Sequence, residues 1–236
     1  WYSVLHRRDL ILYVIRRLEG SLWVVIAGMG TSTINDIINN DLRKIIIMNK
    51  TKIVRIGNIL IGGGNPISVQ SMTNTDTRDI KSTVRQLKSL EDAGVDIVRL
   101  AVLDMDAAKS IKEIKSQTKI PLIADIHFDY RLALESIKNG IDALRLNPGN
   151  IKDKEKVKEV IKEAKARDLT IRVGVNGGSL DRAIYKEVSP ENMVKSAGEH
   201  IKLMEDLNFT NIKVSLKSSD IKTTIDANIL FRKKYW

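Results

Sequence analysis

Short apolar runs alternate with amphipathic stretches along most of the chain after residue 50. The runs are rich in Val, Ile and Leu, and their length and composition predict strands. They lie at Ile67–Met72, Ile97–Val102, Ile120–Ile126, Ala143–Asn147, Thr170–Val175 and Asn211–Leu216. Between them apolar residues recur every three or four positions, as at Ile80, Val84 and Leu87, which predicts helices. This alternation is typical of a parallel sheet covered by helices.

A smaller pattern precedes the first long strand. The runs Ile53–Gly57 and Asn58–Ile61 predict a hairpin, and the glycines at 62–64 predict a turn after it. No dinucleotide-binding fingerprint follows the first long strand, so we favour a barrel over an open doubly wound sheet. The expected fold is an α/β fold of the (β/α)8 TIM-barrel type, incomplete, with about six strands.

Residues 1–47 have a different pattern. Two apolar runs, Leu10–Ile15 and Leu22–Met29, are separated by a segment with three charged residues. Each run is shorter than the ~20 apolar residues that span a bilayer. We therefore expect an N-terminal extension over 1–47, helical or poorly ordered and outside the main fold, followed by a partial barrel over 48–236.

The charge balance points to an anionic partner. The 236 residues include 39 Lys and Arg against 29 Asp and Glu, a formal net charge of +10. Lysines and acids interleave in the richest run, Lys152–Lys165, which is typical of a solvated helix face. The sequence has no nucleic-acid-binding motif. We expect a cytoplasmic protein that binds a small anion, with neither nucleic acid nor membrane as a partner.

Cations also occur within the predicted strands. Arg99, Arg145 and Arg172 each lie in the middle of an apolar strand, and Lys213 repeats the pattern. A buried cation is costly unless it meets an anion, and the planar guanidinium suits phosphate. The arginines therefore either converge on one anionic ligand or form structural ion pairs. The candidate partners for such pairs are Asp96, Asp125 and Asp142.

Asp125 and His127 are candidate catalytic residues. They lie two apart on one strand, and hence on the same face, where they could bind hydroxyl groups or transfer protons. A strand-end histidine bonded to neighbouring backbone explains His127 equally well. A metal site is not favoured, because His6, His127 and His200 show no ligand spacing. The absence of cysteine excludes thiolate metal sites and a cysteine nucleophile within these residues.

Six motifs occur in an order that resembles the hydroxymethylbutenyl diphosphate synthases, the reductive enzymes of the methylerythritol phosphate route to isoprenoids. They are the segments 69–75, 98–101, 124–128, 144–150, 171–176 and 214–219. The resemblance implies a barrel that binds a cyclic diphosphate. The positions that match the family's diphosphate-binding residues are Arg99, Arg145, Arg172, Asn176 and Lys217. Those that would line the same barrel mouth are Met72, Asn74, Asp125, His127 and Asn147.

The resemblance also implies parts that these residues do not provide. The family carries a four-iron four-sulfur cluster on a C-terminal domain, receives electrons from ferredoxin or flavodoxin, and works as a homodimer. Without cysteine we expect the chain to hold no cluster and to show no reductase activity alone. Two alternatives stay open: a fragment that binds phosphorylated ligands without turnover, and a phosphate-binding barrel enzyme similar to pteroate synthases.

Overall fold

A computed structural model describes residues 14–18, 22–26, 51–127, 129–146, 154–181 and 183–235. Six parallel strands form one curled sheet in which each strand pairs with the next along the chain. They are β5 (Gln70–Met72), β6 (Ile97–Val102), β7 (Leu122–Ile126), β8 (Ala143–Leu146), β9 (Thr170–Asn176) and β10 (Ile212–Lys217). Among the described strands the sheet does not close, so β5 and β10 are its edges. The predicted incomplete barrel of six strands is confirmed.

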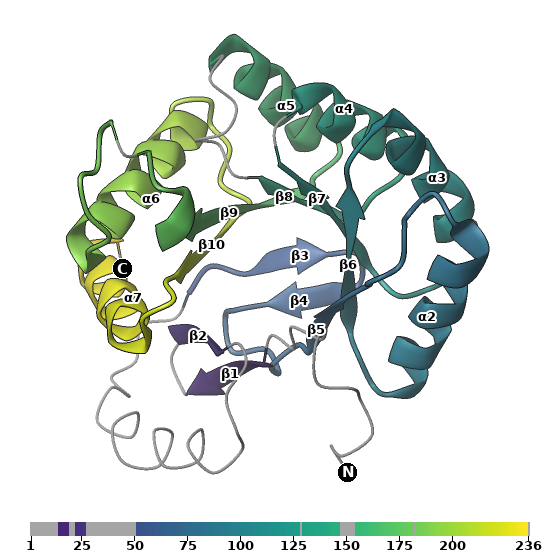
Figure 1. The fold of residues 1–236 in the computed structure, drawn as a ribbon, viewed down its shortest axis with the longest axis horizontal. Coiled ribbons are helices and arrows are strands. Elements are labelled where there is room, and N and C mark those ends of the chain that lie inside the picture. Colours follow the sequence, from purple (N-terminus) through teal and green to yellow (C-terminus); the bar gives the residue numbers. More distant parts are fainter. Residues whose placement is uncertain are drawn as a thin grey trace.

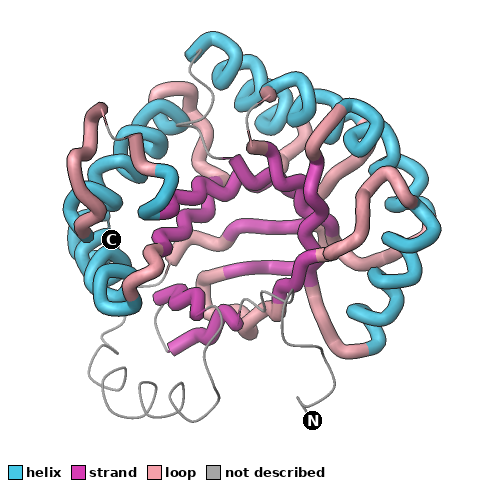
Figure 2. The backbone as a smooth tube through the Cα atoms, viewed as in Figure 1, coloured by secondary structure: helices cyan, strands magenta, loops and turns pink. Residues whose placement is uncertain are grey.

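Helices cover the convex face of the sheet as an outer ring (Figures 1 and 2). They are α2 (Ile80–Asp92), α3 (Met105–Ser116), α4 (Tyr130–Lys138), α5 (Lys154–Ala166), α6 (Pro190–Glu205) and α7 (Ile221–Tyr235). Asp79, Asp104 and Ser189 accept hydrogen bonds from the first-turn amides of α2, α3 and α6, which fixes where these helices begin. The apolar face of each helix packs on strand residues such as Leu100 and Leu144, which are fully buried.

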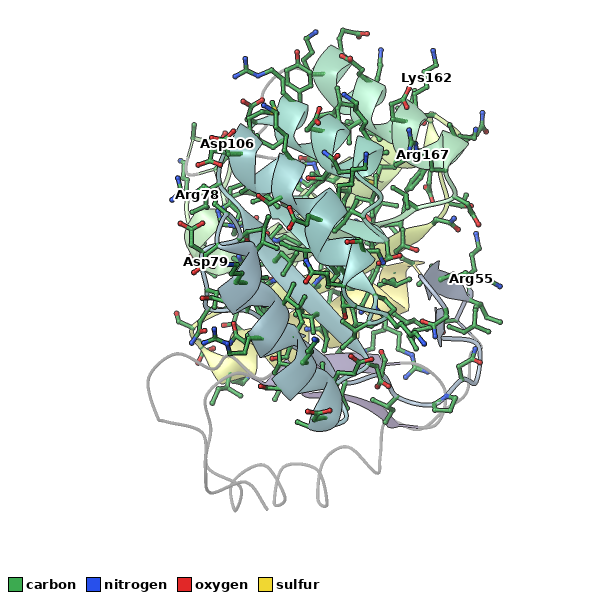
Figure 3. The ribbon with its side chains drawn as sticks, turned by 90° about the vertical axis from the view of Figure 1, so that its right-hand side faces the viewer. Arg55, Arg78, Asp79, Asp106, Lys162 and Arg167 are labelled. Carbon is green, nitrogen blue, oxygen red and sulfur yellow. The ribbon has the colours of Figure 1, made fainter. Side chains whose placement is uncertain are left out.

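A hairpin closes the N-terminal end of the sheet. Strands β3 (Val54–Ile56) and β4 (Ile59–Ile61) pair antiparallel, and their apolar residues pack on Ile97 and Ile123. The Thr170 hydroxyl donates a 2.6 Å hydrogen bond to the Arg55 carbonyl, which ties the hairpin to β9. Figure 3 shows Arg55 at one end of the molecule and Arg78, Asp79 and Asp106, near the helix starts, at the other. The hairpin therefore lies at the end of the sheet opposite the helix starts that follow the C-terminal ends of the strands.

The described part of the N-terminal extension is a second hairpin. Where we expected a helical or poorly ordered segment, β1 (Val14–Leu18) and β2 (Leu22–Ile26) pair antiparallel. Their Val and Ile residues favour strands over helix because β-branched side chains fit a pleated surface. Strand β2 lies against α7 and β10. The other residues of 1–47 lie outside the described part of the chain.

Candidate functional site

The predicted strand cations share one face of the sheet. Cα partners in neighbouring parallel strands point their side chains to the same side, and Arg172 is the partner of both Arg145 and Lys213. Arg99 is likewise the partner of Met72, and Asp125 of Arg145. The intervening residues, such as Leu100 and Leu144, pack on the helices, so this face is the concave interior. The structure thus brings the strand cations into one interior row, in which Arg145, Arg172 and Lys213 share a level and Arg99 lies two residues nearer the N-terminal ends of the strands.

Asp125 joins this row at its centre. One of its carboxylate oxygens accepts a hydrogen bond from Arg145 Nη1 at 2.9 Å, and the other lies 3.3 Å from Arg99 Nε. His127 Nε2 lies 3.3 Å from the first oxygen. One buried carboxylate therefore orients two guanidinium groups and an imidazole.

The two other candidate ion-pair partners, Asp96 and Asp142, bond to other groups. Asp96 accepts a 2.7 Å hydrogen bond from the Val69 amide, and Asp142 accepts one of 2.7 Å from the Leu122 amide. Asp142 also pairs with Lys115 on the outer ring at 2.6 Å. The structural ion-pair interpretation therefore holds for Asp125 alone among the three aspartates, and it covers Arg99 and Arg145.

Positive charge dominates the interior. The buried charged side chains of the described residues are Arg99, Arg145, Arg172, Lys213 and Asp125, four cations against one carboxylate. Burial, followed by the charge of Arg172, lowers the pKa of Lys213 to about 7. Buried cations in such excess are stabilised when a multiply charged anion enters. The arrangement is therefore suited to binding an anion.

Neighbouring side chains hold the arginines in place. Arg99 Nε and Nη2 lie 3.3 and 3.1 Å from the Met72 sulfur, which is a weak acceptor. Arg172 Nε donates to the Ser215 hydroxyl at 3.1 Å. A Cβ at Gly174 would lie 3.0 Å from Arg145 Nε, so glycine leaves the room that this guanidinium occupies. Sequence reasoning missed the supporting roles of Ser215 and Gly174, although each lies two residues beyond a strand cation on the same face.

The remaining candidates lie around the mouth. The His127 side chain is 45% exposed, and Asn176 and Lys217 are partly exposed Cα partners at the ends of β9 and β10. Asn74 is exposed, and its side-chain carbonyl accepts a 2.8 Å hydrogen bond from Gln86 of α2. The structure therefore holds Asn74 against the outer ring and not among the arginines. Asn147 lies outside the described residues.

The described part of the chain offers neither a cluster of metal ligands nor a membrane-spanning helix. Within it, no three His, Cys, Asp or Glu side chains lie close enough together to hold a metal ion. His200 lies in α6, where burial lowers its pKa. None of the described helices has the length and apolar character needed to cross a membrane.

Comparison with known proteins identifies close relatives. A family model described as the GcpE TIM-barrel domain matches residues 51–236. The chain is 53% identical over 181 residues to the 4-hydroxy-3-methylbut-2-en-1-yl diphosphate synthase (flavodoxin) of Clostridium perfringens, covering 75% of this chain and 52% of the relative. It is 57% identical over 175 residues to the synthase of the same name from Dehalococcoides mccartyi, covering 74% and 50%. The chain thus spans about half the length of these relatives.

Solved structures show a more distant likeness. The dihydropteroate synthase of Yersinia pestis superposes with a TM-score of 0.52 at 11% identity, over 70% of this chain and 61% of that one. The Xanthomonas albilineans enzyme gives a TM-score of 0.51 at 13% identity, over 75% and 71%. At such identities the likeness concerns the fold alone.

Proposed function

The chain belongs to the GcpE family, and from this we propose that its sheet supplies the substrate-binding half of a step in isoprenoid biosynthesis. The step is the reductive ring opening of 2-C-methyl-D-erythritol 2,4-cyclodiphosphate to 4-hydroxy-3-methylbut-2-enyl diphosphate. It is an oxidoreductase reaction, and the relatives' names indicate flavodoxin as the electron donor.

The observation that carries this proposal is the charge of the barrel interior. Four buried cations face one buried carboxylate among the described residues, on the strands that lead to the open mouth. The cyclodiphosphate brings the negative charge that this interior lacks, and the fork of each arginine can donate two parallel hydrogen bonds to phosphate oxygens. Bound diphosphate would therefore stabilise the buried row of cations.

The proposed roles follow from position in the site. Arg99, Arg145 and Arg172 bind the diphosphate from the interior, and Asn176 and Lys217 bind it from the rim. Asp125 orients the arginines, and His127, half exposed beside it, is placed to donate or accept a proton at the substrate. The other residues proposed to line the mouth are Met72, Asn74 and Asn147. Asn74 would have to leave Gln86 to reach the ligand.

The reductive half of the reaction needs groups that these residues do not contain. The cluster implied by the family uses cysteine thiolates, and the 236 residues include none. The residues present therefore do not fit a cluster, and no step proposed for them passes through one. We expect binding without turnover from these 236 residues alone.

Calorimetric titration with the cyclodiphosphate tests this function. We expect saturable binding to the chain and a loss of affinity of about 10-fold to 100-fold in Arg145→Met, as is typical for a charge-assisted hydrogen bond. Arg85→Met, which removes an exposed arginine from α2, is the matched control and should bind like the unmodified chain. The proposal fails if the folded chain binds no cyclodiphosphate, or if both variants bind it equally well.

A further inference from the structure

The free side of β10 borders a cavity of about 360 Å³. Ile212, Lys213 and Val214 all line it, although successive residues of a strand point to opposite faces. A cavity that meets both faces of one strand must lie along the edge of that strand. Among the described strands β10 pairs with β9 alone, so no strand pairs with the backbone groups of this edge. One of them, the Leu216 carbonyl, accepts a 3.2 Å hydrogen bond from the Asn228 side chain of α7.

The other walls of this cavity come from three elements. Helix α7 contributes Asn228, Phe231 and Arg232, and α6 contributes Ile201. The chain before β3 and the turn after β4 form the floor with Lys52 and Gly62. The result is a groove between a helix and a strand edge whose apolar part, Ile201, Ile212, Val214, Leu216 and Phe231, is a surface that an apolar strand would fit.

We propose that this open side of the half-barrel is covered by the chain's own N-terminal hairpin, β1–β2. Strand β2 lies against both α7 and β10, the two elements that form the groove, and Figure 1 shows the hairpin beside the opening of the sheet. The sequence of β2, Leu-Trp-Val-Val-Ile, is apolar throughout and matches the groove in character.

The hairpin covers the edge without becoming part of the sheet. Among the described strands, β1 and β2 pair with each other in a separate two-stranded sheet. The pairing of β10 with β9 therefore does not depend on the hairpin. Removal of the hairpin would expose apolar surface on α7 and the free edge of β10.

Cross-linking tests the position of the hairpin. The chain has no cysteine, so the double variant Val24→Cys, Arg232→Cys carries one cysteine in β2 and one in the groove wall on α7. We expect a short bismaleimide to join them within one chain. The matched control, Val24→Cys with Lys112→Cys on α3, should give at least tenfold less intramolecular product. Equal yields from the two pairs, or products that join two chains only, would overturn the proposal.

Hydrogen exchange gives an independent test in the full chain. The double variant Val24→Asp, Val25→Asp places charges in β2, and we expect the amides of β10 and α7 to exchange at least tenfold faster. The control Asn39→Asp adds charge to the same extension outside the hairpin and should leave these amides unchanged. Unaltered exchange in α3 shows that the barrel remains folded. Unaltered exchange in β10 and α7 in the hairpin variant would overturn the proposal.

Discussion

Replacing Lys213 by methionine should make the protein more stable at neutral pH. Lys213 is 7% exposed on β10, and burial together with the charge of Arg172 lowers its pKa from 10.5 to about 7. At about 1.4 kcal/mol per pH unit, this gap corresponds to a cost of about 5 kcal/mol for keeping the charged amine in the folded state. Methionine fills a similar volume and carries no charge, so most of this cost should disappear.

The pH dependence follows from the direction of the pKa change. The unfolded chain holds the Lys213 proton up to about pH 10.5, whereas the folded protein holds it only below about pH 7. Between these values the unfolded state binds more protons, so the free energy of unfolding rises with pH. The cost is full below about pH 7 and has vanished above about pH 10.5.

Urea unfolding followed by circular dichroism measures this effect. Between about pH 7 and about pH 9 the free energy of unfolding of the unmodified chain should rise by about 2 kcal/mol relative to that of Lys213→Met. Lys162→Met, on the outer helical ring, should follow the unmodified chain at every pH. The reasoning is refuted if Lys213→Met runs parallel to the unmodified chain across this range, or if it is the less stable protein at about pH 7.

Three further substitutions test the interior. In Gly174→Ala the new methyl group displaces the Arg145 guanidinium, so the affinity for the cyclodiphosphate, measured by calorimetry, should fall several-fold. The control Gly178→Ala adds a methyl group in open space and should bind the cyclodiphosphate like the unmodified chain. Asp125→Asn breaks a buried ion pair and should lower the free energy of unfolding by about 3–5 kcal/mol, as measured by thermal unfolding. Pyrophosphate should then raise the melting temperature of the variant more than that of the unmodified chain. An equal rise in both proteins would contradict this expectation. The Gln70 side-chain amide is fully buried and has no hydrogen-bond partner among the described residues. Gln70→Met should therefore raise the free energy of unfolding in urea by about 1–2 kcal/mol. A lower free energy of unfolding would show that the amide does form hydrogen bonds.

The barrel strands could be predicted from sequence because they are buried on both faces. Runs such as Ile97–Val102, in which Arg99 is the one charged residue, alternate with helical patterns, and this alternation favours strands of a parallel sheet. The N-terminal runs Leu10–Ile15 and Leu22–Met29 belong to no such alternation, and apolar runs of this length suit a strand or a helix equally. Their β-branched residues were the available signal for the observed hairpin, and the contact of β2 with α7 depends on tertiary packing.

The residue types of the site could be predicted from the sequence, but not which of these residues pair with one another. A charged residue in the centre of an apolar strand marks Arg99, Arg145 and Arg172 without any knowledge of register. The choice of Asp125 over Asp96 and Asp142 as the partner of Arg99 and Arg145 depends on which strand residues face the interior at neighbouring levels of the sheet. The position of Asn74 likewise depends on its hydrogen bond with Gln86 of α2, because the pattern of the strand residues does not show where that helix packs.

The central claim is that the interior of the half-barrel binds a diphosphate through its buried cations. Calorimetry with two ligands that differ in the phosphates, the cyclodiphosphate and free methylerythritol, tests it most directly. We expect the cyclodiphosphate to bind, with an affinity that falls as the salt concentration rises, and methylerythritol to show no measurable binding. Equal affinity for the two ligands, or binding of the cyclodiphosphate that survives replacement of Arg145 and Arg172 together, would contradict the account.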